Sequence, residues 1–267
     1  FSTPLKQASG SVGSHFLSIP SMLHALALLG GLEALLRASG YSKGLFGWFK
    51  AIPWKNPGTS GLLLSMLLFG IGGIVAQPQT TLQPNLLFHN TMWVPAHFHL
   101  TVVGGTTLAF MALSYYLIPL VTLRRLFSVS MARLQIYLAF IGILTMAVSM
   151  SVLGWLGAPR RTLIFPETFA EYPYWIVPAT ALGVGVLIFI ASGVMYVLNA
   201  ILTILAGMRT IDPKMLMDGL MSPYEIKDPS VARKIGSLVI VIIILVIVLL
   251  SLYFVSFIRL ALLPPIW

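Results

Sequence analysis

Long uncharged apolar runs are the feature that most restricts how this chain can fold. The stretch SLVIVIIILVIVLLSLYFV at 237–255 carries no charged residue, and about 20 apolar residues suffice to cross a bilayer as a helix. Six segments are long and apolar enough to do so, at 11–38, 59–78, 91–121, 131–157, 173–207 and 235–262. Lipid offers backbone groups no hydrogen bonds, and the two-residue alternation of a barrel strand is missing. We therefore predict an all-α integral membrane protein, with about six transmembrane helices in a single domain over 1–267.

The amino-acid composition excludes a soluble globular protein. Hydrophobic residues make up 58% of the chain and charged residues only 9%, whereas about a quarter of the residues in soluble domains are charged. The chain has no cysteine, which excludes disulfides, iron–sulfur clusters and thiolate metal sites. Its net charge of +9 comes from basic residues scattered between apolar segments, so nucleic acid is not expected as a partner. The opening FSTPLKQASG lacks an initiating Met and the pattern of a signal peptide, so we expect a portion of a larger subunit.

The basic residues predict the orientation of the helices, because Lys and Arg concentrate in cytoplasmic connectors. Twelve of the sixteen fall on one side of the predicted membrane: Arg37, Lys43, Lys50, Lys55, Arg124, Arg125, Arg133, Arg209, Lys214, Lys227, Arg233 and Lys234. The connectors 39–58, 122–130 and 208–234 are therefore predicted to be cytoplasmic, the last of them a polar connector. Glu33, near the cytoplasmic end of the first helix, is predicted to reach water and to pair with Arg37 four residues later.

Arg160 and Arg161 are adjacent basic residues on the outer side, where such residues are scarce. A pair of guanidinium groups in that position indicates an anionic partner, such as a carboxylate or a phosphate. The helix that precedes the pair ends on the side where the helix at 91–121 begins. We therefore expect the arginines to lie at the same depth as the histidines of the stretch HNTMWVPAHFHL at 89–100.

That stretch contains three of the five histidines of the chain, and the spacing of two of them is informative. His97 and His99 stand two residues apart, which on an α-helix turns their side chains about 200° from each other. A single metal ion held by one helix requires ligands three or four residues apart. The spacing therefore predicts two separate partners on opposite faces of one helix.

Several motifs resemble subunit I of haem–copper terminal oxidases, and they are most similar to the B-class, ba-type cytochrome c oxidases. These are HNTMWVPAHFHL at 89–100, GLFGWFKAIPWKNP at 44–57, APRRTLI at 158–164 and GIGGIV at 70–75. The resemblance implies the last six helices of a thirteen-helix subunit. It also implies an enzyme of the prokaryotic plasma (inner) membrane, which reduces oxygen to water at a haem–copper centre and couples this reaction to proton pumping.

The resemblance implies a role for each histidine and arginine predicted near the outer side. These residues, His89, His97, His99, Arg160 and Arg161, form the outer rim. His97 would bind the iron of the high-spin haem, where oxygen is reduced, and His99 the iron of the low-spin haem. The second nitrogen of each imidazole would need a partner, such as a backbone carbonyl or a hydroxyl group of a neighbouring helix. Arg160 and Arg161 would hold the haem propionates, which face outward. His89 would take part in proton transfer near them.

The resemblance also implies residues of a proton pathway and shows two departures from the family. The first helix would contribute hydroxyl groups to a channel from the cytoplasm, with Ser11 and Ser14 as the candidates. Asn85 stands where the B-class has an aspartate, so a proton site that depends on that carboxylate would have to form differently. Ala96 replaces a frequent glycine and adds a methyl group near the haem.

Other chains must complete such a site. In the family, the copper ligands and the second axial histidine of the low-spin haem lie upstream of the region that this chain matches. The expected partners are therefore the N-terminal part of subunit I, a copper-bearing subunit II, cytochrome c or a similar electron donor, and membrane lipid. Two alternatives stay open: a nitric oxide reductase-type haem–copper enzyme, which usually has HGH in place of HFH, and a non-catalytic haem-binding or transport subunit.

Overall fold

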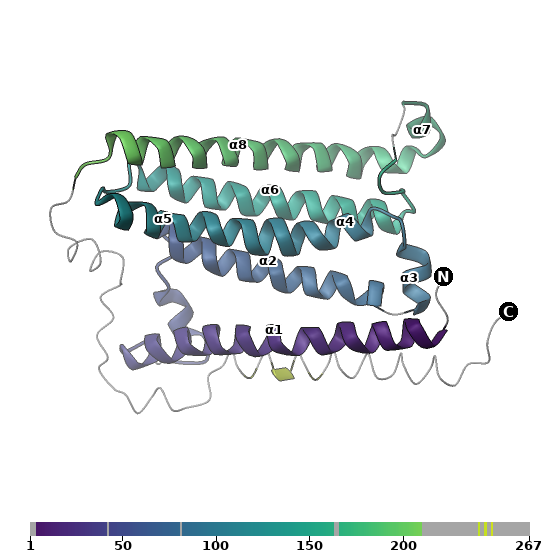
Figure 1. Ribbon diagram of the computed structural model, residues 1–267, viewed down its shortest axis with the longest axis horizontal. Coiled ribbons are helices and arrows are strands. Elements are labelled where there is room, and N and C mark those ends of the chain that lie inside the picture. The colour runs from purple at the N-terminus through teal and green to yellow at the C-terminus, as the bar shows by residue number, and fades with distance from the viewer. Residues whose placement is uncertain are drawn as a thin grey trace. The chain divides into compact units, whose positions relative to one another are not determined.

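The computed structural model describes residues 4–41, 43–80, 82–162 and 166–209, and the single positions 240, 243, 244 and 247. The described residues form helices and no β-strand, in agreement with the predicted all-α class (Figure 1). In chain order, the elements are α1 (Pro4–Ala38), η1 (Gly47–Ala51), α2 (Pro57–Thr80), α3 (Leu82–Phe88), α4 (Trp93–Phe98), η2 (His99–Thr107), α5 (Leu108–Thr122), α6 (Val129–Trp155), α7 (Pro166–Glu171), η3 (Pro173–Trp175) and α8 (Ile176–Ala206).

Four helical stretches of the described residues are long and apolar enough to cross a membrane. They are Pro57–Thr80, Trp93–Thr122, Val129–Trp155 and Pro173–Ala206. These stretches confirm four of the predicted segments to within a few residues. The predicted segment 11–38 is also helical, but its helix α1 begins earlier, at Pro4. The sixth predicted segment, 235–262, and most of the polar connector 208–234 lie outside the described residues.

The chain divides into two compact units, residues 53–222 and residues 1–52 with 223–267. In the unit 53–222, helix α6 lies between α8 on one side and the helices α4 and α2 on the other (Figure 1). The elements α4, η2 and α5 follow one another without a break and pack along α2. The three helices that carry the predicted site, α2, α4 and α6, are thus direct neighbours.

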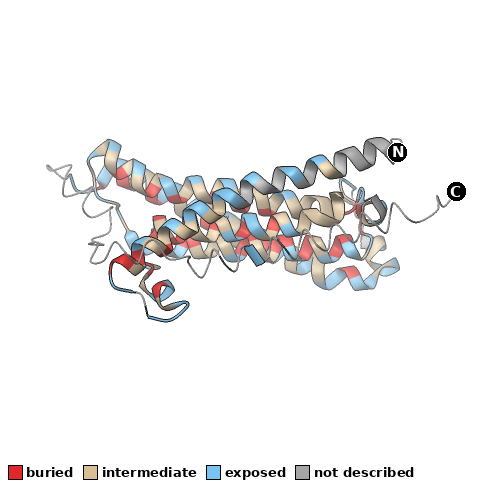
Figure 2. Cartoon of the chain, turned by 90° about the horizontal axis from the view of Figure 1, so that it is seen from below, coloured by how far each residue is buried: buried red, intermediate tan, exposed pale blue. Residues whose placement is uncertain are grey.

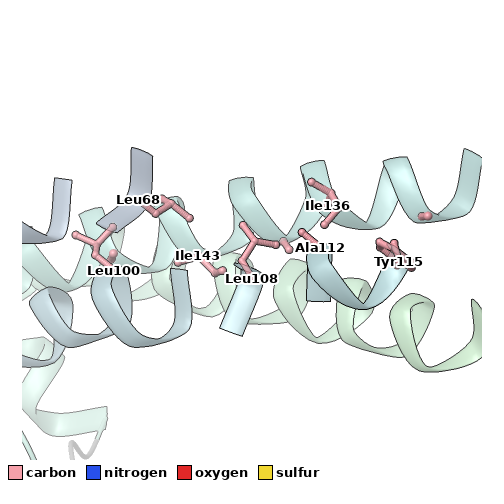
Figure 3. Packing of buried hydrophobic residues seen from close by; sticks show 10 residues of the cluster. Leu68, Leu100, Leu108, Ala112, Tyr115, Ile136 and Ile143 are labelled. Atoms are coloured by element: carbon pink, nitrogen blue, oxygen red, sulfur yellow. The ribbon is translucent and has the colours of Figure 1, made fainter. Parts of the chain in front are cut away.

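A continuous apolar core joins α2, η2, α5 and α6. Its buried members include Leu68, Leu100, Leu108, Ala112, Ile136 and Ile143 (Figure 3). Exposed positions also run along these helices (Figure 2). They include large apolar residues, and on α8 the residues Val177 and Leu187 are 76% and 68% exposed. An outward apolar face is what lipid requires, and it leaves close packing and hydrogen bonds to hold the helices together.

Close backbone approach between α6 and α8 is made possible by two glycines that face each other. A Cβ atom added at Gly142 would lie 2.8 Å from the backbone nitrogen of Phe189 and 3.0 Å from the Gly185 carbonyl oxygen. One added at Gly185 would lie 2.7 Å from the Met146 nitrogen and 2.9 Å from the Gly142 oxygen. The two helices therefore meet backbone to backbone, as in membrane helix pairs that pack through small residues.

Replacing Gly185 by alanine is expected to destabilise the protein by about 1–3 kcal/mol, because the added methyl group would meet backbone atoms that no rotamer change can move. The measurement is the melting temperature of the purified protein in detergent. Gly183→Ala, on the same helix, is the matched control, since an added Cβ there meets nothing within 4 Å. Equal melting temperatures for the two variants would contradict the close crossing of α6 and α8.

Polar side chains of α8 bind the segment that leads into α6. The Asn199 side chain accepts a hydrogen bond from the Ser128 backbone nitrogen (3.2 Å) and donates one to its carbonyl oxygen (3.0 Å). The Thr203 hydroxyl accepts one from the Phe127 nitrogen (3.1 Å). At the same end, Arg124 donates to the Gly207 carbonyl at the C-terminus of α8 (2.9 Å). These contacts hold the start of α6 against the end of α8.

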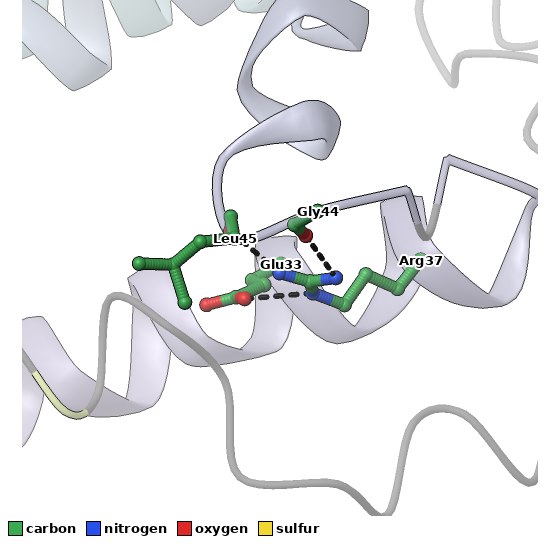
Figure 4. A network of polar contacts seen from close by, with 4 residues as sticks. All are labelled: Glu33, Arg37, Gly44 and Leu45. Atoms are coloured by element: carbon green, nitrogen blue, oxygen red, sulfur yellow. Dashed lines mark hydrogen bonds and ion pairs between the residues drawn. The ribbon is translucent and has the colours of Figure 1, made fainter.

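Glu33 of α1 does not reach water, contrary to the sequence-based prediction. Its carboxylate accepts a hydrogen bond from Arg37 Nε at 2.7 Å, which confirms the predicted pairing, but the residue is completely buried (Figure 4). Arg37 also donates to the carbonyl oxygens of Gly44 (3.1 Å) and Leu45 (2.6 Å). A carboxylate can stay buried when it is paired and hydrogen-bonded in this way, because these contacts compensate for its lost hydration.

Candidate functional site

His97 lies near the end of α4 and is oriented by a carbonyl group of a neighbouring helix. Its Nδ1 atom is 2.9 Å from the Gly72 carbonyl oxygen of α2. A carbonyl can only accept, so this contact selects the tautomer with the proton on Nδ1 and leaves the Nε2 lone pair available to a metal. Gly72 permits the contact, because a Cβ atom there would lie 2.6 Å from Thr101 Cγ2.

His99 is oriented in the same way by its own helix. Its Nδ1 atom is 2.7 Å from the carbonyl oxygen of Pro95, four residues earlier. Between the two histidines, the Phe98 ring stands 4.4 Å from the His99 ring and is 44% exposed. The partners of His97 and His99 therefore lie in different directions, and each histidine can present Nε2 to a separate ligand.

The helix changes type at His99. Residues His99–Thr107 form a π-helix, η2, in which the hydroxyl groups of Thr106 and Thr107 donate to the carbonyls of Thr101 and Val102, five residues earlier. π-helical turns inside α-helices are rare and are often found at functional sites. Sequence reasoning missed this element, and its one signal is the run of weak helix formers from Gly104 to Thr107.

The segment after α6 is bound to the segment before α4. Thr91 and Pro159 form an antiparallel bridge, and the Met92 nitrogen donates to the Ala158 carbonyl (2.9 Å). Arg160 donates twice to Asn90, from its backbone nitrogen to the carbonyl oxygen (2.8 Å) and from its side chain to Oδ1 (3.1 Å). The structure therefore brings Arg160 to the start of the helix that carries His97.

Arg160 and Arg161 keep their charges available to an anion. Among the described residues, neither guanidinium group forms an ion pair with a carboxylate. Arg161 is exposed and has a φ of +57°, a left-handed conformation that is uncommon for a residue other than glycine. An arginine pair without a carboxylate partner fits the binding of an anionic group at this end of α6.

The contacts of the other predicted site residues, His89, Ser11 and Ser14, are described in less detail. His89 follows the end of α3, and its backbone nitrogen donates to the Asn85 carbonyl (2.7 Å). It stands next to Asn90 and so belongs to the same rim as Arg160. Ser11 and Ser14 lie in α1, but their side chains are outside the description, and α1 belongs to the other compact unit.

Two observations test whether these residues fit haem groups. His97 and His99 each have Nδ1 on a different backbone carbonyl, so each offers one imidazole nitrogen, Nε2, to a ligand. A single neutral imidazole suits an iron whose other ligands come from a porphyrin. In addition, the Nε2 atom of Gln79 at the C-terminal end of α2 is buried without a hydrogen-bond partner in the described residues. Both observations fit haem groups with carboxylates at this rim.

Comparisons with known proteins agree on one family. The model of the family "Cytochrome C and Quinol oxidase polypeptide I" matches residues 2–184. A cytochrome c oxidase subunit 1 of Thermus thermophilus is 38% identical over 174 residues, which cover 63% of this chain and 30% of the relative. A second Thermus thermophilus sequence of the same description is 39% identical over 114 residues, 40% of this chain and 99% of that sequence.

A solved structure has the same fold. It is a haem–copper terminal oxidase dimer determined by cryo-electron microscopy, and the two chains align with a TM-score of 0.73 and 25% identity. The aligned region covers 92% of this chain and 44% of the oxidase chain. The present chain therefore spans less than half of that oxidase chain and 30% of the longer Thermus relative.

Proposed function

Because the chain belongs to the cytochrome c and quinol oxidase polypeptide I family, we propose that it forms part of the catalytic subunit of a terminal respiratory oxidase. The complete enzyme reduces oxygen to water at a haem–copper centre with electrons from cytochrome c or a similar donor, and couples this reaction to proton pumping. The closest functional class is the B-class of cytochrome c oxidases.

In this proposal, His97 and His99 would each hold the iron of one haem. His97 binds the high-spin haem iron through Nε2, while the Gly72 carbonyl holds its Nδ1 proton. His99 binds the low-spin haem iron, and the Pro95 carbonyl holds its Nδ1 proton. A contact of this kind fixes the tautomer and the orientation of a metal-binding imidazole. The haem held by His97 would supply the iron at which oxygen is reduced.

The rim residues bind charge and hold protons. Arg160 and Arg161 hold the haem propionates through charge-assisted hydrogen bonds, and Asn90 orients Arg160 for this contact. His89, beside Asn90, exchanges protons with water near the propionates. Since Asn85 cannot ionise, the proton site of this chain depends on His89 and not on a carboxylate at that position.

The remaining parts of the proposed complex come from other chains. Copper is bound by residues of the N-terminal part of subunit I, and a copper-bearing subunit II delivers the electrons.

The arginine rim faces outward from a prokaryotic plasma membrane, and Arg124 and Arg133 face the cytoplasm. The length of α6, Val129–Trp155, supports opposite sides for Arg133 and Arg160, since 27 residues span about 40 Å. Ser11 and Ser14 are proposed to line the proton pathway from the cytoplasm.

The observation that carries this proposal is the shared geometry of His97 and His99. Each histidine has its Nδ1 atom on a backbone carbonyl, at 2.9 and 2.7 Å, and the two carbonyls belong to different helices. In both residues, this contact leaves the Nε2 lone pair as the remaining position for a metal.

The purified complex is expected to show two spectrally distinct haems in a reduced-minus-oxidised visible spectrum, and one of them should react with carbon monoxide. A preparation without any haem signal would contradict the proposal. Haems that do not react with carbon monoxide would indicate a non-catalytic haem-binding subunit. Consumption of nitric oxide without consumption of oxygen would indicate a nitric oxide reductase-type enzyme.

A further inference from the structure

We propose that Gln79 is a further cofactor-contact residue, whose side-chain amide donates a hydrogen bond from Nε2 to a haem propionate at the outer rim. The inference rests on the proposed function and assigns a contact to a residue outside the histidine and arginine motifs. It starts from the missing hydrogen-bond partner of this amide group.

The Nε2 atom of Gln79 is buried and has no hydrogen-bond partner among the described residues. Leaving a buried donor unpaired costs about 1–3 kcal/mol, and native proteins satisfy nearly all such groups. A second glutamine of the same helix shows how the cost is usually avoided, since Gln77 donates to the Gly73 carbonyl one turn earlier (3.4 Å). The amide of Gln79 therefore requires an acceptor from outside the described residues.

The helix geometry places Gln79 on the side of α2 that faces the site. It stands seven residues after Gly72, whose carbonyl binds His97, and seven residues bring an α-helix back to nearly the same face. It stands one turn beyond Val75, whose carbonyl accepts a hydrogen bond from Trp93 Nε1 at 2.9 Å. Trp93 is the first residue of α4, so Gln79 lies level with the outer end of that helix, where Arg160 binds Asn90.

The chemistry of the amide and of its surroundings selects the acceptor. An N–H group cannot bind a metal ion, and it can only donate to an oxygen or another lone pair. Arg160 and Arg161 have no carboxylate partner among the described residues, and this includes Glu167 and Glu171 of the following helix α7. A carboxylate lying between the arginines and Gln79 would satisfy all of these donors together. The haem propionate is the carboxylate that the proposed function supplies there.

The test is a spectroelectrochemical titration of both haems in the assembled complex, with Gln79→Leu, Gln79→Glu and Gln77→Leu as variants. A donor to a propionate screens its negative charge and so favours the reduced iron. Gln79→Leu is therefore expected to shift the midpoint potential of one haem downward. Gln79→Glu should lower this midpoint potential further at high pH, where the new carboxyl group is ionised. The potential should rise again as the pH falls and that group is protonated. Gln77→Leu should leave both potentials unchanged.

The outcomes separate this inference from the proposed function. If both haems are present and their potentials in Gln79→Leu and Gln79→Glu match those of the wild type, the amide binds water and the inference is wrong. If the wild-type complex contains no haem, the proposed function fails. If Gln79→Leu does not assemble, the nearly isosteric Gln79→Glu remains as the test. A haem midpoint potential in Gln79→Glu that shows no pH-dependent difference from the wild type would then contradict the inference.

Discussion

Replacing His99 by alanine is expected to remove the low-spin haem spectrum, while the high-spin haem still binds carbon monoxide. His97→Ala should do the reverse and abolish the carbon monoxide-reactive haem. The physical reason is that each imidazole has its own Nδ1 partner, the Gly72 carbonyl for His97 and the Pro95 carbonyl for His99. Loss of one imidazole therefore leaves the orientation of the other intact.

The measurement is the haem content and the reduced-minus-oxidised spectrum of each purified variant, recorded with and without carbon monoxide. Thr180→Ala is a suitable control, because Thr180 is exposed and its hydroxyl group donates to the Ile176 carbonyl of its own helix, α8. It should retain both haem signals. Equal loss of both haems in His97→Ala and His99→Ala would mean that the two substitutions disrupt folding and do not act on separate ligands.

Replacing Gly72 by alanine is expected to impair the high-spin haem selectively, although residue 72 is not itself a ligand. The added Cβ atom would lie 2.6 Å from Thr101 Cγ2, 2.9 Å from Leu100 Cβ and 3.2 Å from the Thr101 nitrogen. Helices α2 and η2 must then move apart, and the Gly72 carbonyl moves away from His97 Nδ1. Loss of the hydrogen-bond partner of a metal-binding histidine typically weakens metal binding or activity about 10- to 100-fold.

The matched control for this substitution is the next residue, Gly73. A Cβ atom at Gly73 would meet nothing within 4 Å, and alanine is a better helix former than glycine. Gly73→Ala is therefore expected to keep the carbon monoxide-reactive haem at the wild-type level and to melt no earlier. If the carbon monoxide difference spectrum falls equally in both variants, the contact between Gly72 and His97 does not orient the high-spin haem ligand.

Much of the helical framework could be predicted from the sequence, because in lipid the chain has few structural choices. The spans near 59–78 and 131–157 follow from length and hydropathy alone, and the structure differs by only a few residues at their ends. The pairing of Glu33 with Arg37 follows from their four-residue spacing. The complete burial of Glu33 does not follow, since burial depends on groups distant in sequence, including the loop that folds back over Arg37.

The sequence by itself predicts two different partners for His97 and His99 and an anion beside Arg160 and Arg161. Both conclusions depend on local spacing and on charge relative to the membrane, which are properties of the chain alone. Only the tertiary structure decided which carbonyl groups orient the imidazoles, where the π-helix begins and which amide lacks an acceptor. The contact between Gly72 and His97 depends on how closely α2 approaches η2, and that distance is set by packing at Gly72, because neighbouring helices in lipid are held by contact geometry more than by hydropathy.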